Sequence, residues 1–210
     1  MTDPAQEVPE GLWSRLRADP VRAPEHIALA ASELHAPAAA RWAAEKRARL
    51  GASGRELGRM AKRRHAAMAR FEGAATGVGG IFTAVPDLVL LAWIQSRLVF
   101  FVAAAYGFDP RDPMRPAELL VLRDLYPDPE TARRALDGVG KTVAESYLTG
   151  KLARGREQAL LSRLLQFAGK RTVSRAARRW IPGIAIAFNA IANERDTRAL
   201  ADRAIAFYGG

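Results

Sequence analysis

The sequence is poor in the residues that build covalent crosslinks and metal centres. Its 210 residues include no cysteine and only three histidines. Without cysteine there is no disulfide and no thiolate metal ligand, so we expect a reducing compartment, the cytoplasm. His26, His35 and His65 are nine and thirty residues apart, which does not match the i, i+4 pairing of helical zinc sites. We therefore expect no metal site.

Catalytic signatures are missing as well. The chain has no G-x-S-x-G, no P-loop and no G-x-G-x-x-G after a strand. Gly77, Gly79 and Gly80 lie between expected helices without a phosphate-binding lysine, so we interpret them as a packing or hinge segment. We therefore expect that the protein is not an enzyme and that it has no catalytic residues and no cofactor. An uncharacterised hydrolase stays open as an alternative, because polar groups from separate helices can converge without a sequence signature.

The start of the chain lacks the features of a secretory signal. Residues 1–10 are acidic, contain proline and have no basic or long apolar stretch. We interpret them as a disordered tail. A chain of this length supports one ordinary core, so residues 11–210 are expected to form a single domain.

No stretch alternates apolar and polar residues as an exposed strand does, and every long segment has helical spacing. The sequence therefore predicts an all-α fold, a single compact bundle of about eight helices. Proline, glycine and capping residues place helical segments at residues 12–16, 24–34, 37–50, 55–72, 86–106, 116–126, 129–149, 151–169, 171–180 and 182–208. Ser53 and Asp128 are the expected N-caps of the segments 55–72 and 129–149, and Gly107 is expected to end the segment 86–106.

The segment 86–106 is expected to lie at the centre of the bundle. Its apolar residues cover every side of a helix, and a surface position would leave some of them in water. Pro86 opens this helix, and Asp87 stabilises its N-terminus. Arg97 near its middle offsets the gain from membrane insertion, so a buried helix is favoured over a membrane span. Its best packing partners are the helix from Pro182 and the stripe Leu160 to Leu165.

Two polar residues fall within apolar segments and are candidates for burial. Arg97 lies in the expected central helix, and we expect it to pair with an acid such as Glu145 or to reach a polar edge. Asn189 lies in the apolar part of the last helix.

Positive charge predominates in the sequence. There are 32 basic and 22 acidic residues, for a formal net charge of +10. Only five of the basic residues are lysines, and a GC-rich genome explains that preference. Guanidinium groups bind phosphate bidentately, so the excess suits nucleic acid or anionic lipid.

The arginines gather into two helical stripes. The helix 55–72 is amphipathic, and its apolar side is expected to comprise Leu57, Met60, Ala61, Met68 and Phe71. The positive stripes, each next to an apolar helix, comprise Arg59, Arg63 and Arg70, and then Arg171, Arg175, Arg178 and Arg179 beside Trp180. This arrangement is typical of interfacial helices on anionic lipid, with a solvated helix face as the alternative.

Three stretches resemble a known family. GAATGVGGIFTAVPDL and the helix ending AAAYGFDPRDP resemble the signature region of the bacterial EcsC family, and IPGIAIAFNAIANERDTRALADRAIAFY resembles its C-terminal region. The resemblance covers about Glu56 to Tyr208. The family takes its name from a gene beside an ABC-transporter operon and has no agreed activity. The resemblance therefore implies a membrane-adjacent context and supplies no catalytic residues.

Together these features predict a non-enzymatic, cytoplasmic helical protein that associates peripherally with an anionic membrane or a membrane protein complex. A nucleic-acid-binding protein is the alternative from another class. It is less favoured, because there is no distinct helix-turn-helix signature and most aromatic residues suit a core. A small-molecule ligand and the oligomeric state stay open.

Overall fold

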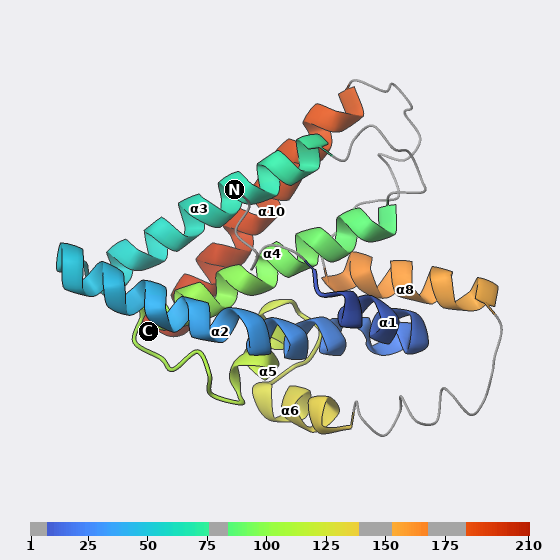
Figure 1. Cartoon of the computed structure of the whole chain (residues 1–210), viewed down its shortest axis with the longest axis horizontal. Coiled ribbons are helices and arrows are strands. Elements are labelled where there is room, and N and C mark those ends of the chain that lie inside the picture. The colour runs from blue at the N-terminus through green and yellow to red at the C-terminus, as the bar shows by residue number, and fades with distance from the viewer. Residues whose placement is uncertain (1–7, 76–83, 139–152, 168–183) are drawn as a thin grey trace.

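The computed structural model describes residues 8–75, 84–138, 153–167 and 184–210. Within these ranges the chain forms eight α-helices, one short 3-10 helix and no strand (Figure 1). This confirms the predicted all-α bundle. The helices are α1 (Glu10–Ala18), α2 (Ala23–Leu50), α3 (Gly54–Ala75), α4 (Ala84–Ala105), α5 (Arg115–Leu122), α6 (Pro129–Asp137), α8 (Ala153–Phe167) and α10 (Ile184–Gly209), with the 3-10 helix η2 at Pro20–Arg22.

Helix α4 is the core of the bundle. Every side chain from Leu91 to Ala105 is buried, so no exposed apolar face runs along it. The segment Val85–Ala105 is long and apolar enough to cross a membrane by length and composition, but 94% of an 18-residue apolar stretch within it is buried inside the protein. The prediction of a central buried helix is confirmed.

Helices from both halves of the chain cover α4. On one side α2 runs parallel to it, with the ring of His35 against Trp93 and the ring of Trp42 against Phe101. Helices α3 and α10 lie along another side (Figure 1). Helix α8 also packs against α4 and contributes Leu164, which is fully buried. The two partners expected from the sequence, α8 and α10, are therefore confirmed, and α2 and α3 join them.

Helix α2 does not break at Pro37. The structure shows one continuous helix over Ala23–Leu50 with Pro37 inside it, so the predicted division into two helices is wrong. Proline removes the hydrogen bond to the carbonyl four residues earlier, here that of Glu33. Glu33 is exposed, so water can satisfy this carbonyl, and the packing of α2 on α4 holds the helix together.

The C-terminal end of α4 is fixed by backbone bonds and by Arg47 of α2. Gly107 has a φ of +88°, and the amide of Phe108 donates to the carbonyl of Ala103 at 3.1 Å. Together with the Gly107 amide bonded to the Ala104 carbonyl at 3.2 Å, this is a Schellman motif. The Arg47 guanidinium donates to the carbonyls of Ala104 and Ala105 at 2.9 and 2.7 Å. Gly107 ends the helix as predicted.

Tyr106 fills a socket lined by three glycines. A Cβ added to Gly58 would lie 3.0 Å from the Tyr106 ring, and one added to Gly209 would lie 3.1 Å from it. A Cβ on Gly54 would meet the Ala105 carbonyl oxygen at 3.0 Å. The absent side chains therefore let α3 and α10 close around the end of α4.

Helices α5 and α6 are shorter than the sequence predicts. Helix α5 ends at Leu122 instead of Tyr126, because Asp124 adopts a φ of 56° and its amide bonds to Val121 in a second Schellman-type ending. Asp128 caps α6 as expected and accepts from the Thr131 amide at 2.7 Å. Helix α6 ends at Asp137, and the rest of the helix predicted to reach residue 149 lies outside the described residues.

The burial of α4 predicts the effect of a charge on it. Leu98 is fully buried, so Leu98→Asp should remove most of a typical stability of about 5–15 kcal/mol, because an unpaired carboxylate would be desolvated. Val21→Asp is the matched control, since Val21 is 58% exposed. Circular dichroism and soluble yield measure the outcome, and a cooperatively folded Leu98→Asp protein would contradict the central position of α4.

The glycine socket predicts opposite effects for one kind of substitution. Gly58→Ala should destabilise the protein by about 1–2 kcal/mol, because the new methyl group meets the confined Tyr106 ring. Gly11→Ala should stabilise it by up to about 1 kcal/mol, since Gly11 lies in α1 with nothing within 4 Å of the added carbon. Urea denaturation compares both variants with the wild type. A stabilised Gly58→Ala protein would show that the socket has spare room.

Candidate anion-binding surface

Helix α3 presents a basic outer face to solvent. Viewed down the helix axis at about 100° per residue, Arg59, Arg63 and Arg70 fall within about 40° of one another. Arg55 lies at one edge of this face, and Phe71 and Arg64 lie near the other. The α3 outer face consists of the exposed residues Arg55, Glu56, Arg59, Arg63, Arg64, Ala67, Arg70 and Phe71.

Packing on the other side of α3 fixes the direction of this face. Leu57, Ala61, His65 and Ala69 are fully buried, and α3 packs against both α4 and α10. The helix starts in a capping box, as predicted from Ser53. The Ser53 amide donates to the Glu56 carboxylate at 2.8 Å, and the Glu56 amide donates to the Ser53 hydroxyl at 3.3 Å.

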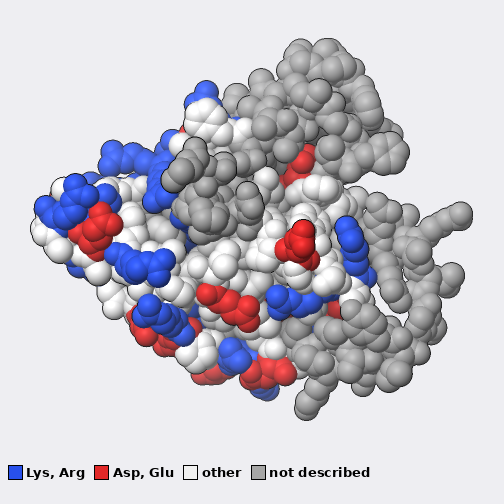
Figure 2. Space-filling model, viewed as in Figure 1, with Lys and Arg blue, Asp and Glu red and all other residues white. Residues whose placement is uncertain are grey.

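The outer face keeps an excess of positive charge. Two cations of α3 have partners on α10: Lys62 donates to Asp202 at 2.7 Å, and Arg70 lies 3.7 Å from Glu194. Within the described part of the chain, Arg55, Arg59 and Arg63 form no ion pair. Basic side chains predominate where α2 ends and α3 begins (Figure 2).

The single acid on this face does not neutralise it. The hydrogen bonds from the Ser53 amide and hydroxyl lower the pKa of Glu56, with a smaller contribution from Arg59. Its carboxylate is therefore held at the N-terminal cap, where it satisfies backbone groups of α3. The three arginines without ion pairs remain available to an external anion.

The second predicted arginine stripe cannot be compared with the first. Arg171, Arg175, Arg178, Arg179 and Trp180 lie outside the described residues. The same holds for the hinge residues Gly77, Gly79 and Gly80.

The remaining predicted residues fall on α4 and α10. Helix α4 starts two residues before Pro86, and Asp87 is the acid of its first turn. Arg97 is 3% exposed, and its guanidinium lies over the Phe101 ring at 5.1 Å, which confirms its burial. Asn189 belongs to α10, but its side chain lies outside the described part. Glu145, suggested as a partner of Arg97, also lies outside it.

Phe71 does not join the apolar side of α3. Its side chain is 75% exposed, so its predicted place beside Met68 in the packed face is wrong. At about 100° per residue Phe71 lies about 60° away from Met68 towards the arginines. It therefore falls at the edge of the apolar arc, where the neighbouring helices no longer cover it.

Sequence reasoning missed that all three histidines are buried. His35 and His65 are fully buried and His26 is 1% exposed. In a sequence, a buried histidine differs from an exposed one only in its position on the side of a helix that faces the core. His26 lies 3.4 Å from Asp19, and the Nδ1 atom of His65 is 2.8 Å from the Ala61 carbonyl.

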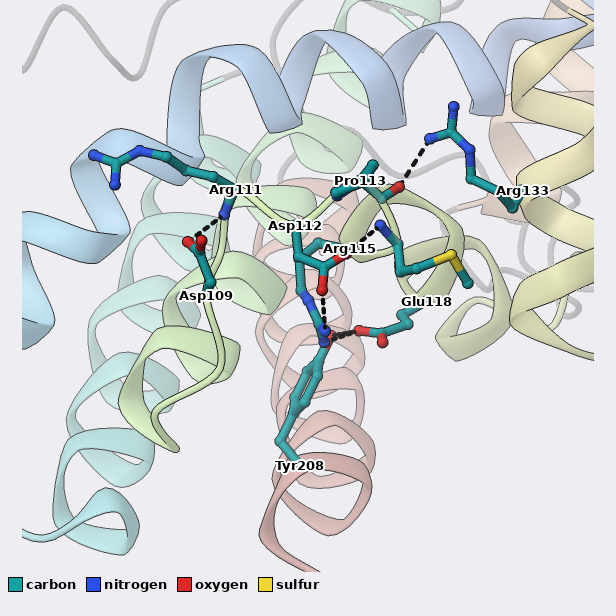
Figure 3. A network of polar contacts seen from close by, with 9 residues as sticks. Asp109, Arg111, Asp112, Pro113, Arg115, Glu118, Arg133 and Tyr208 are labelled. Atoms are coloured by element: carbon teal, nitrogen blue, oxygen red, sulfur yellow. Dashed lines mark hydrogen bonds and ion pairs between the residues drawn. The ribbon is translucent and has the colours of Figure 1, made fainter.

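Polar groups also join α10 to α5 and to the loop between α4 and α5 (Figure 3). The Tyr208 hydroxyl donates to the Glu118 carboxylate at 2.6 Å, and Arg115 pairs with Glu118 and, at 3.3 Å, with Asp112. Burial raises the pKa of Glu118, while the bonds from Tyr208 and Arg115 oppose that rise. The hydrogen bond and the ion pairs together hold the C-terminal end of α10 in place.

A chain of hydrogen bonds crosses the interior of the bundle. Buried Arg123 donates to Gln95 of α4, and Gln95 donates to Thr197 of α10 at 3.2 Å. The Arg123 guanidinium lies 5.1 Å from the Phe167 ring of α8. These contacts therefore connect α4 with α8, with α10 and with the residue that follows α5. Among the described residues no three His, Asp or Glu side chains converge to hold a metal ion.

The resemblance seen in the sequence is decided by comparison with known families. The model of the EcsC protein family matches residues 25–209. The chain belongs to the EcsC family. A stretch of 72 residues is 35% identical to protein EcsC of Bacillus subtilis (strain 168), covering 34% of this chain and 30% of that protein. No solved structure matches the chain.

Two of the stretches that resemble the EcsC family meet in the structure. Tyr106 and Phe108 lie within the stretch AAAYGFDPRDP, Tyr208 ends the C-terminal stretch, and Gly209 directly follows it. The Phe108 and Tyr208 rings lie 5.2 Å apart, and Gly209 lines the Tyr106 socket. The two stretches are therefore parts of one packed corner of the EcsC fold.

The buried histidines predict acid sensitivity. Burial lowers the pKa of His65 from 6.5 to about 3; the bond to Ala61 opposes this shift, and Arg97 and Arg64 add to it. Between these values the unfolded chain takes up a proton that the folded state excludes. Stability from this group is complete above about pH 6.5 and falls by about 1.4 kcal/mol per pH unit below it.

Urea denaturation measures the free energy of unfolding at pH 7 and at pH 5. We expect the decrease in this free energy from pH 7 to pH 5 to be about 2 kcal/mol smaller in His65→Leu than in the wild type. His26, whose pKa burial also lowers, should keep part of the dependence in the variant. Equal losses in the two proteins would show that His65 is accessible to protons in the folded state.

Proposed function

We propose that this EcsC protein is a non-enzymatic cytoplasmic protein that associates peripherally with anionic membrane through the α3 outer face. The observation that carries the proposal is the group of exposed arginines without ion pairs, Arg55, Arg59 and Arg63, on a helix fixed to the core. A membrane protein complex with an acidic surface is the other partner that fits this charge.

The spacing of the arginines supports a lipid surface. Successive members are four residues apart, which is about 6 Å along the helix axis. Long flexible guanidinium side chains at this spacing can each reach a separate phosphate. Each basic residue near an anionic membrane contributes about 1 kcal/mol to binding. Three arginines therefore support a reversible, salt-sensitive association.

Peripheral attachment also agrees with the position of α4. The apolar segment Val85–Ala105 is already covered by α2, α3, α8 and α10, so it contributes nothing to membrane binding while the bundle is intact. The outer face of α3 needs no rearrangement to meet a bilayer.

Paired substitutions test the proposal. Arg59→Ser/Arg63→Ser should reduce partitioning onto vesicles of phosphatidylcholine with 30% phosphatidylserine by about 30-fold at about 50 mM salt, since two residues contribute about 2 kcal/mol. Sedimentation with the vesicles measures the bound fraction. Higher salt should release the wild-type protein, because exposed charges are screened.

Arg17→Ser/Arg41→Ser is the matched control. This variant also removes two positive charges, from exposed positions on α1 and α2. We expect a much smaller loss of vesicle binding. Equal losses in the two variants would assign binding to net charge alone. A wild-type protein that ignores these vesicles but shifts on duplex DNA in a salt-sensitive manner would replace the membrane proposal with nucleic-acid binding.

A further inference from the structure

The most exposed large apolar side chain among the described residues is Phe71. It is 75% exposed, compared with 42% for Phe108 and 44% for Phe207. The rings of Phe108 and Phe207 each pack against Tyr208, whereas no aromatic ring of the described residues packs against Phe71. An aromatic ring left in water on a rigid helix indicates a surface that binds an apolar partner.

The neighbours of Phe71 identify that partner. Phe71 directly follows Arg70 and lies about 12 Å along α3 from Arg63. Ala67, one turn before Phe71, is small and exposed, so nothing bulky on the outer face separates the ring from the arginines. A cationic row beside a projecting ring matches a bilayer surface, where phosphate lies at the headgroup level and hydrocarbon lies just below it.

We propose that Phe71 inserts below the headgroups of an anionic bilayer while Arg59 and Arg63 bind the phosphates above it. This inference rests on the proposed membrane association and adds an apolar anchor to it. Charge binding alone weakens steeply with salt, whereas burial of the ring does not. The anchor therefore gives the protein a component of binding that persists at high salt.

The absence of cysteine permits a direct test of insertion. Phe71→Cys carries the only thiol in the chain, and a polarity-sensitive nitrobenzoxadiazole dye can be attached there. We expect a blue-shifted, brighter emission on vesicles with 30% phosphatidylserine, and quenching by a spin label within the acyl chains. Phe207→Cys, labelled in the same way, is the control on α10 and should show neither change.

A second arm measures the contribution to affinity. Phe71→Ser should weaken vesicle partitioning about tenfold, and its binding at about 0.5 M salt should disappear, because truncation removes most of a buried phenyl group. Phe207→Ser should partition like the wild type. Melting curves for both variants check that the fold is intact.

The outcomes separate this inference from the proposed function. Vesicle binding without a dye response at residue 71 overturns the insertion and leaves peripheral association standing. A dye response at residue 207 alone also overturns the insertion of Phe71, and places the membrane contact near the C-terminal end of α10. Failure of the wild-type protein to sediment with anionic vesicles overturns the proposed function and the inference together.

Discussion

The need to cover α4 on every side determines the rest of this fold. A helix with apolar side chains around its whole circumference cannot lie on a surface, so helices from both halves of the chain must surround it. Helices α2, α3, α8 and α10 do so, and each turns one side inward. Helix α3 can then carry arginines on its outer side without cost to the core.

The same covering places polar groups where water cannot reach them. Arg97 and His65 both lie against the Phe101 ring, and Arg123 lies against Phe167. A cation over an aromatic face retains part of its electrostatic stabilisation after losing water. Aromatic rings therefore serve this bundle as partners for charge as well as bulk for packing.

Local signals made much of the fold predictable. The uniform apolar character of α4, the cap at Ser53 and the stop at Gly107 each depend on a few neighbouring residues. Pro37 was misjudged because its effect depends on whether the carbonyl of Glu33 faces water. The arginines of the outer face were found by helical spacing. Other features depend on which helices pack together, and a single sequence does not give that information. They are the exposure of Phe71, the burial of the histidines and the socket around Tyr106.

The pairing of α3 with α10 joins segments that are far apart in the sequence. Lys62 and Asp202 are 140 residues apart in sequence, so this contact has the long loop closure that helical bundles usually avoid. Early local contacts can bring α2, α3 and α4 together, but one side of α4 stays in water until α10 docks. A chain in which α10 has not yet docked would expose part of an apolar segment of membrane-spanning length, and such exposure favours aggregation or binding to lipid.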